Sequence, residues 1–109
     1  MGLSAERAAT NEARFREANE QINEKVVELG SQERSAPYLC ECEDERCTTI
    51  LLLTAAEYEE VRSGSRQFVV APGHDEDAPV LAQREGFTVI EKTGEEGRLV
   101  EELDPRREV

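Results

Sequence analysis

The chain contains the segment Cys40-Glu41-Cys42-Glu43-Asp44-Glu45-Arg46-Cys47, and all three of its cysteines lie within these eight positions. Side chains two apart on a strand point to the same face, so Cys40 and Cys42 can approach one ion together while Glu41 faces away. The four residues before Cys47 are enough to turn the chain back. The segment therefore predicts three sulfur ligands from one strand and the turn that follows it.

A fourth ligand is needed, because structural zinc sites hold four cysteine or histidine donors. The only histidine, His74, follows Pro72-Gly73 at the end of a predicted strand. If that strand lies near the cysteines, the imidazole completes the site; otherwise Asp75, Asp77 or water takes the fourth place. An iron-sulfur cluster is disfavoured, since the usual clusters take four cysteines and the Rieske type needs two histidines. The expected structural Zn²⁺ ligands are Cys40, Cys42, Cys47 and His74.

The alternative interpretation is three buried, reduced cysteines and an exposed loop histidine, which is ordinary in a cytosolic protein. The crowding of the cysteines argues against it. Their neighbours Glu41, Glu43, Asp44 and Glu45 make this a polar, turn-forming segment, in which we expect small apolar thiols to have no core to fill. We therefore favour the metal site.

Composition limits the possible partners and the size of the core. The chain has 109 residues, a formal charge of −12, 5% aromatic residues and no tryptophan. The excess of acids argues against nucleic acid or an anionic membrane as a partner, and the length fits one domain. The longest apolar run, Ile50 to Leu53, is far too short to span a bilayer, and no export signal is recognisable. We expect a cytoplasmic protein.

Residues 1–35 are predicted to form a helix and a linker. Ser4 caps a helix over residues 5–29, Gly30 ends it, and the first turns are expected to fray. An apolar stripe at helical spacing is expected to pack on the rest of the chain or on another helix. The stripe consists of Phe15, Ala18, Ile22, Val26 and Leu29.

Residues 36–103 are predicted to form a small zinc-stabilised α+β domain with a mixed sheet and two short helices. Residues 48–53 are expected to form its central strand, covered on both faces, because the run is β-branched and then continuously apolar. Thr54-Ala55-Ala56-Glu57 is a capping box that opens a helix with Tyr58 and Val61 inward, closed by Gly64. The other predicted strands are 38–42, 67–71 and 87–92.

The C-terminal third is predicted to contain a short helix, a turn, a strand and a tail. Asp77 is expected to cap a short helix over residues 78–85, ended by Gly86. Residues 93–97 read as a turn, and 98–103 as a returning strand in preference to a helix. Residues 104–109 are expected to be a solvated tail.

Several of these segments together resemble a family of small, uncharacterised actinobacterial proteins. The matching segments span most of the chain from about residue 10 to Arg106. The resemblance implies that the three cysteines and the histidine of the Pro-Gly-His turn form one site in a bacterial, cytosolic protein, and it implies no activity. The family commonly has a Gly-Asp turn after the second cysteine, where this chain has Glu43-Asp44. The segments are 11–17, the cysteine cluster, 53–62 and 68–74.

The sequence favours a binding or regulatory module over an enzyme. A protein partner could bind the N-terminal helix or an acidic face, and a homodimer is also possible. A redox-sensing zinc-thiolate switch is the first alternative. A zinc hydrolase with Asp75, Glu76 or Asp77 as base is less favoured, because three thiolates with an open position are unusual for hydrolytic zinc.

Overall fold

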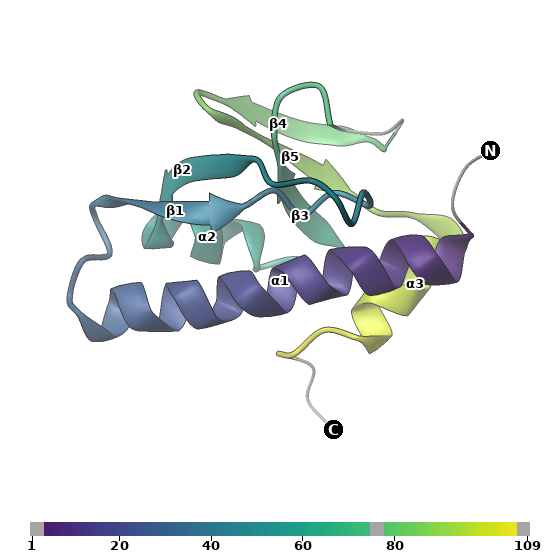
Figure 1. The fold of residues 1–109 in the computed structure, drawn as a ribbon, viewed down its shortest axis with the longest axis horizontal. Coiled ribbons are helices and arrows are strands. Elements are labelled where there is room, and N and C mark those ends of the chain that lie inside the picture. Colours follow the sequence, from purple (N-terminus) through teal and green to yellow (C-terminus); the bar gives the residue numbers. More distant parts are fainter. Residues whose placement is uncertain (1–3, 75–77, 107–109) are drawn as a thin grey trace.

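The computed structural model describes residues 4–74 and 78–106. Figure 1 shows a long helix running along one side of two small sheets, with the shorter helices packed near it. The expected α+β class is confirmed, although two antiparallel sheets replace the expected single mixed sheet. No helix among the described residues is both long and apolar enough to cross a membrane. The elements are α1 (Ala5–Glu28), β1 (Ser35–Leu39), β2 (Ile50–Thr54), α2 (Ala55–Val61), β3 (Gln67–Val70), β4 (Val80–Arg84), β5 (Phe87–Glu91) and α3 (Gly94–Glu102).

Helix α1 begins and ends as its sequence predicts. The Ser4 hydroxyl accepts a hydrogen bond from the Arg7 N–H at 3.2 Å, and Gly30 follows the helix with a φ of 71°. A left-handed φ of this kind costs glycine little and other residues much more. The two ends of the helix are therefore fixed by local chemistry.

The face of α1 that packs on the protein is polar, so the predicted apolar stripe is wrong as the main contact. Ile22 and Val26 lie only at the edge of the core, and Leu29 is 67% exposed. The predicted fraying of the first turns is also wrong for Ala8 and Ala9, which are buried. The helix packs in this way because the core offers polar partners to its side chains. Its buried residues are Ala8, Ala9, Asn11, Glu12, Arg16, Asn19 and Asn23.

Strands β1 and β2 form a two-stranded antiparallel sheet in which Pro37 pairs with Leu52. The expectation that residues 48–53 form a central strand covered on both faces is wrong. Leu51 and Leu53 are buried, whereas Ile50 and Leu52 are 52% and 63% exposed. With β1 as its only partner in the sheet, β2 has one face on the core and one in solvent.

Strands β3, β5 and β4 form the second sheet in that order. The predicted helix over residues 78–85 is wrong, because this segment is β4, paired with β5. Gly86, with a φ of 91°, turns the chain between these strands instead of ending a helix. The predicted cap, Asp77, lies outside the described residues.

The capping box at the start of α2 is confirmed, but the segment after β5 folds differently from the prediction. The Thr54 N–H donates to the Glu57 carboxylate at 2.8 Å, and the Glu57 N–H donates to the Thr54 hydroxyl at 3.1 Å. The predicted strand at 98–103 is wrong, because Gly94–Glu102 is α3. This helix buries Val100 against the core, while Arg98 pairs with Glu102 one turn on.

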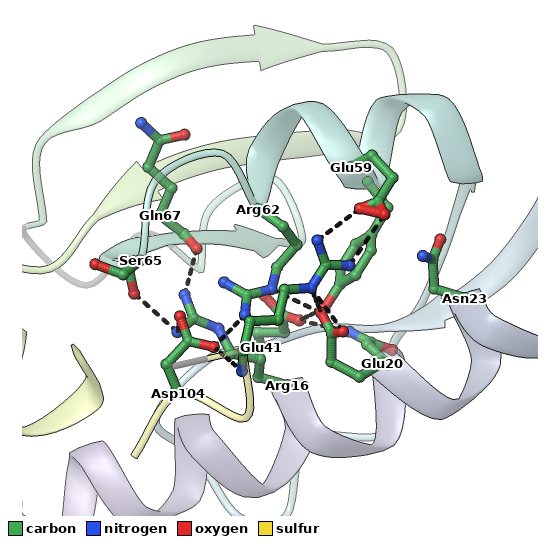
Figure 2. A network of polar contacts seen from close by, with 12 residues as sticks. Arg16, Glu20, Asn23, Glu41, Glu59, Arg62, Ser65, Gln67 and Asp104 are labelled. Carbon is green, nitrogen blue, oxygen red and sulfur yellow. Dashed lines mark hydrogen bonds and ion pairs between the residues drawn. The ribbon is translucent and has the colours of Figure 1, made fainter. Parts of the chain in front are cut away.

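The described part of the C-terminal segment is tied to the protein, so the prediction of a solvated tail is wrong for Asp104. Its side chain is only 7% exposed and binds the Arg62 guanidinium, which also donates to Glu20 at 2.7 Å. Arg106 reaches Glu20 and, at 2.7 Å, Glu59. Figure 2 shows this network, which joins α1, α2 and the C-terminal segment. Residues 107–109 lie outside the described residues.

Candidate metal centre

Four donor atoms converge on one point near the ends of β1 and β3. The sulfurs of Cys40, Cys42 and Cys47 and a ring nitrogen of His74 all lie within 4.8 Å of one another. His74 Nδ1 is 3.5 Å from Cys40 Sγ and 3.8 Å from Cys47 Sγ. A tetrahedral zinc ion, bound at about 2.3 Å to sulfur and about 2.0–2.1 Å to nitrogen, separates its donors by about 3.6–3.8 Å. The predicted residues are therefore brought together at a spacing that suits a metal ion.

Cys40 and Cys42 owe their direction to the extended chain that follows β1. The Glu41 N–H donates to the Val69 carbonyl of β3 at 2.8 Å, which holds this stretch against the edge of the second sheet. Alternation along an extended backbone sends the two sulfurs to one side and the Glu41 side chain to the other. The predicted alternation is confirmed, but the predicted strand over residues 38–42 is displaced, because β1 ends at Leu39 and both cysteines follow it.

Cys47 reaches the site because a tight turn reverses the chain after Glu43. The Cys47 N–H donates to the Asp44 carbonyl at 3.0 Å, and the Arg46 N–H donates to the Asp44 carboxylate at 2.9 Å. A side-chain carboxylate that binds a backbone N–H two residues on is typical of such turns. The turn thus places the third sulfur opposite the first two.

His74 is placed by the turn that ends β3. The His74 N–H donates to the Ala71 carbonyl at 2.9 Å, and Gly73 has a φ of 88°, as the third position of a type II turn requires. The Ala71 N–H points the other way and donates to Cys40 Sγ at 3.1 Å. Ala71 therefore links the histidine turn to the first cysteine, a role that its sequence does not signal.

The centre is buried on one side and open on the other. Cys40 and Cys42 are each 1% exposed and belong to the core, whereas Cys47 and His74 are half-buried. The expectation that these thiols have no core to fill is therefore wrong, and Glu41 between them is itself buried, with 0% exposure. The case for a metal rests on the convergence of the donors.

The surroundings of Cys42 oppose its thiolate form unless a cation is present. The hydrogen bond with Cys40, together with burial, raises the pKa of the Cys42 thiol. A bound divalent cation reverses this preference, because it replaces the thiol protons of its ligands. Metal binding at this centre is therefore expected to release protons and to weaken as the pH falls.

Polar residues beneath the centre form a support that the sequence analysis missed. The Glu41 carboxylate accepts hydrogen bonds from Asn19 at 2.8 Å, from the Tyr58 hydroxyl at 3.0 Å and from the Val69 N–H at 3.0 Å. Burial raises the pKa of Glu41, and the charge of Arg16 opposes this. The sequence does contain a pattern that indicates this support. Glu12, Arg16, Asn19 and Asn23 follow one another at intervals of four, three and four residues, and this spacing puts four polar side chains on one face of a helix.

The alternative ligands and bases proposed from the sequence, Asp75, Glu76 and Asp77, lie outside the described residues. Comparisons with protein-family models, curated proteins and solved structures gave no match to this chain. The fold and the cluster define a small α+β protein with a three-cysteine, one-histidine group that could bind a metal ion.

Proposed function

We propose that Cys40, Cys42, Cys47 and His74 bind a structural Zn²⁺, and that the protein is a zinc-stabilised binding or regulatory module. The observation that supports this proposal is the convergence of four donors from separate segments within 4.8 Å. Three soft sulfurs and one imidazole in this arrangement suit zinc better than the hard cations, which prefer oxygen ligands. The ion would tie the end of β1 and the following turn to the end of β3.

A structural role is favoured over a hydrolytic one. Four protein donors fill a tetrahedral zinc ion, whereas catalytic zinc keeps one position for water or substrate. His74 lies at donor distance from two of the sulfurs, so it takes the position that a reactive water would need. We therefore propose that the zinc has no hydrolytic role.

The first experiment identifies the ion. Protein purified without a histidine tag is expected to contain one zinc per chain by elemental analysis. Cobalt substitution is expected to give the absorption of a tetrahedral site with three thiolates, and zinc X-ray absorption should show three sulfurs, one nitrogen and no water oxygen. Metal-free protein that takes up neither ion would refute the zinc proposal.

We further propose that the partner is a protein with a basic surface that binds the exposed, acidic side of α1. Glu17 and Glu24 are exposed on this side and line a groove beside Arg106. The net charge of −12 would oppose self-association across such a face, so a different protein is favoured over a second copy.

A paired charge reversal tests this surface. The double variant Glu17→Lys/Glu24→Lys should lose a partner that the wild type retains, and salt should weaken the wild-type complex. The variant Glu85→Lys, at an exposed position in the turn between β4 and β5, serves as the control. A partner held equally by all three proteins would place the binding surface elsewhere.

One observation favours a redox switch as the second candidate function: Cys47 is half-buried, whereas Cys40 and Cys42 are buried. In this scheme the Cys47 thiolate attacks hydrogen peroxide and forms a sulfenic acid, releasing hydroxide. The Cys42 thiolate then attacks the sulfenic sulfur and displaces hydroxide to form a disulfide, and the ion loses two of its donors. Release of zinc by mild peroxide, absent in Cys47→Ser reconstituted with zinc, would support the switch.

A further inference from the structure

Helix α1 contacts the backbone on both sides of the first two cysteines through its polar face. The Asn19 amide donates to the Leu39 carbonyl at 2.9 Å and accepts from the Leu39 N–H at 2.7 Å. The same Asn19 nitrogen lies 2.8 Å from the Glu41 carboxylate. Two turns earlier in α1, the Asn11 amide donates to the Glu43 carbonyl at 2.8 Å. One helix thus binds residues 39, 41 and 43, which alternate with the two ligands.

Glu41 is held at both its backbone and its side chain. Its backbone N–H and its carboxylate both bind the main chain of Val69, and Tyr58 and Asn19 complete the shell around its oxygens. In Figure 2 Glu41 lies among the buried polar groups beside Arg16. Because Glu41 is fixed at the backbone and at the end of its side chain, the segment cannot rotate, and the sulfurs of Cys40 and Cys42 stay on the side that faces His74.

We infer that Asn19, Glu41 and Tyr58 are positioning residues of the metal centre: they hold Cys40 and Cys42 in the geometry that an ion requires. This inference rests on the proposed metal site. Partners behind the ligands orient them, and their loss typically lowers metal affinity by about 10–100-fold. The position of α1 therefore sets the affinity of a site to which the helix contributes no ligand.

The chain offers a matched pair of tyrosines for the test. Tyr58 and Tyr38 are both 0% exposed, and their rings stack with centroids 4.8 Å apart. The Tyr58 hydroxyl donates to Glu41, whereas the Tyr38 hydroxyl donates to Asn23 at 2.9 Å. Each change to phenylalanine removes one buried hydroxyl and keeps the ring, but only one of them disturbs the shell of Glu41.

A second pair comes from the same face of α1. Asn19→Ala removes the contacts to Leu39 and Glu41, whereas Asn23→Ala removes only the contact to Tyr38. We expect zinc affinity, measured by competition with a chromophoric chelator, to fall at least tenfold in Asn19→Ala and measurably in Tyr58→Phe. Asn23→Ala and Tyr38→Phe should stay within twofold of the wild type, although each loses some stability.

The cobalt spectrum separates positioning from general destabilisation. Asn19→Ala and Tyr58→Phe should change the intensity of the ligand-field bands of the bound ion, and the two control variants should not. If Asn19→Ala fails to fold, the tyrosine pair decides alone. Unchanged affinity and spectrum in Tyr58→Phe, or equal losses in both members of a pair, would overturn the inference. A wild-type chain that binds no metal would instead refute the proposed function.

Discussion

Replacing Cys42 by serine should destabilise the protein far more in zinc than in chelator. Cys42 is 1% exposed, so in chelator the change leaves a buried hydroxyl with imperfect partners, which costs about 1–3 kcal/mol. Structural zinc binds zinc-finger peptides with an apparent binding free energy of about 10–16 kcal/mol, which corresponds to roughly 3–4 kcal/mol for each of four ligands. The loss in buffered zinc should therefore be roughly 4–7 kcal/mol.

The measurement is urea unfolding of the full chain, once in buffered zinc and once in excess chelator, for the wild type and the variant. Ala36→Ser is the control, because it also places a hydroxyl at a buried position, 7% exposed, without touching the cysteine cluster. Its cost should be the same in both conditions. Equal losses for Cys42→Ser with and without zinc would refute the reasoning, since the sulfur would then act only as a core atom.

Three further predictions concern the ion, the histidine turn and a buried carboxyl group. Free zinc at 1,000 times its Kd stabilises the folded state by about 4 kcal/mol, so chelation should lower the Tm of the wild type by roughly 15 °C or more in a thermal scan. An unchanged Tm would contradict a structural ion. In Gly73→Ala the added Cβ has no atom within 4 Å, but alanine is forced into a left-handed φ, so the change should lower the free energy of unfolding by about 1–2 kcal/mol. It should also weaken zinc binding, measured by competition with a chelator. The control Gly30→Ala should lower the stability without changing zinc binding. Burial and the neighbouring Glu96 raise the pKa of Glu12 to about 10, although the charge of Lys92 opposes this shift. Above pH 4.5 the Glu12 carboxyl group is therefore ionised in the unfolded chain, whereas it keeps its proton in the folded chain. The native state therefore loses stability as the pH rises from 4.5 towards 10, and the stability of Glu12→Gln relative to the wild type should increase between pH 5 and pH 9 in urea unfolding; a constant difference would show that Glu12 is ionised in the fold.

The direction of the two Cys-x-Cys sulfurs and the turns before Cys47 and His74 could be predicted because each is local, whereas the meeting of the two segments depends on the long-range hydrogen bond from Glu41 to Val69. An extended Cys-x-Cys segment aims two sulfurs to one side, and the turns at Asp44 and Gly73 are set by the chemistry of a few adjacent residues. The capping box at Thr54 is local in the same sense, since both of its hydrogen bonds close within four residues. Features of this kind keep their meaning whatever the rest of the chain does.

The segment from Thr93 to Gly97 misled the prediction because its glycines have another purpose. Two glycines within five residues read as a turn, yet Gly97 lies inside α3. A Cβ at this position would stand 2.6 Å from the Lys92 carbonyl oxygen, so only glycine allows the helix to approach so closely. The sequence shows that a glycine is present, but not that the first turn of α3 brings it against the carbonyl of Lys92, five residues earlier.

Strand β4 illustrates a second limit. Four of its five residues, including Val80 and Leu81, are exposed, so its sequence carries no clear alternation. Pairing with β5 across the Gly86 turn makes it a strand, and a bulge between Val80 and Ala82 breaks the register. Because a strand can be defined by its partner, this segment could not be recognised by itself.

The polar face of α1 and the metal centre have complementary effects on the fold, one on its geometry and the other on its stability. Buried ion pairs such as that between Arg16 and Asp104, 3.6 Å apart, are weak evidence for stability, because desolvation offsets much of their attraction. Their contacts are directional, however, so a helix held by Arg16 and Asn19 cannot slide or rotate as one held by an apolar stripe could. The fixed register places Asn19 under Glu41, and Glu41 in turn directs the two sulfurs. In this protein the buried polar groups set the geometry, and we infer that the metal ion supplies the stability that such a core lacks.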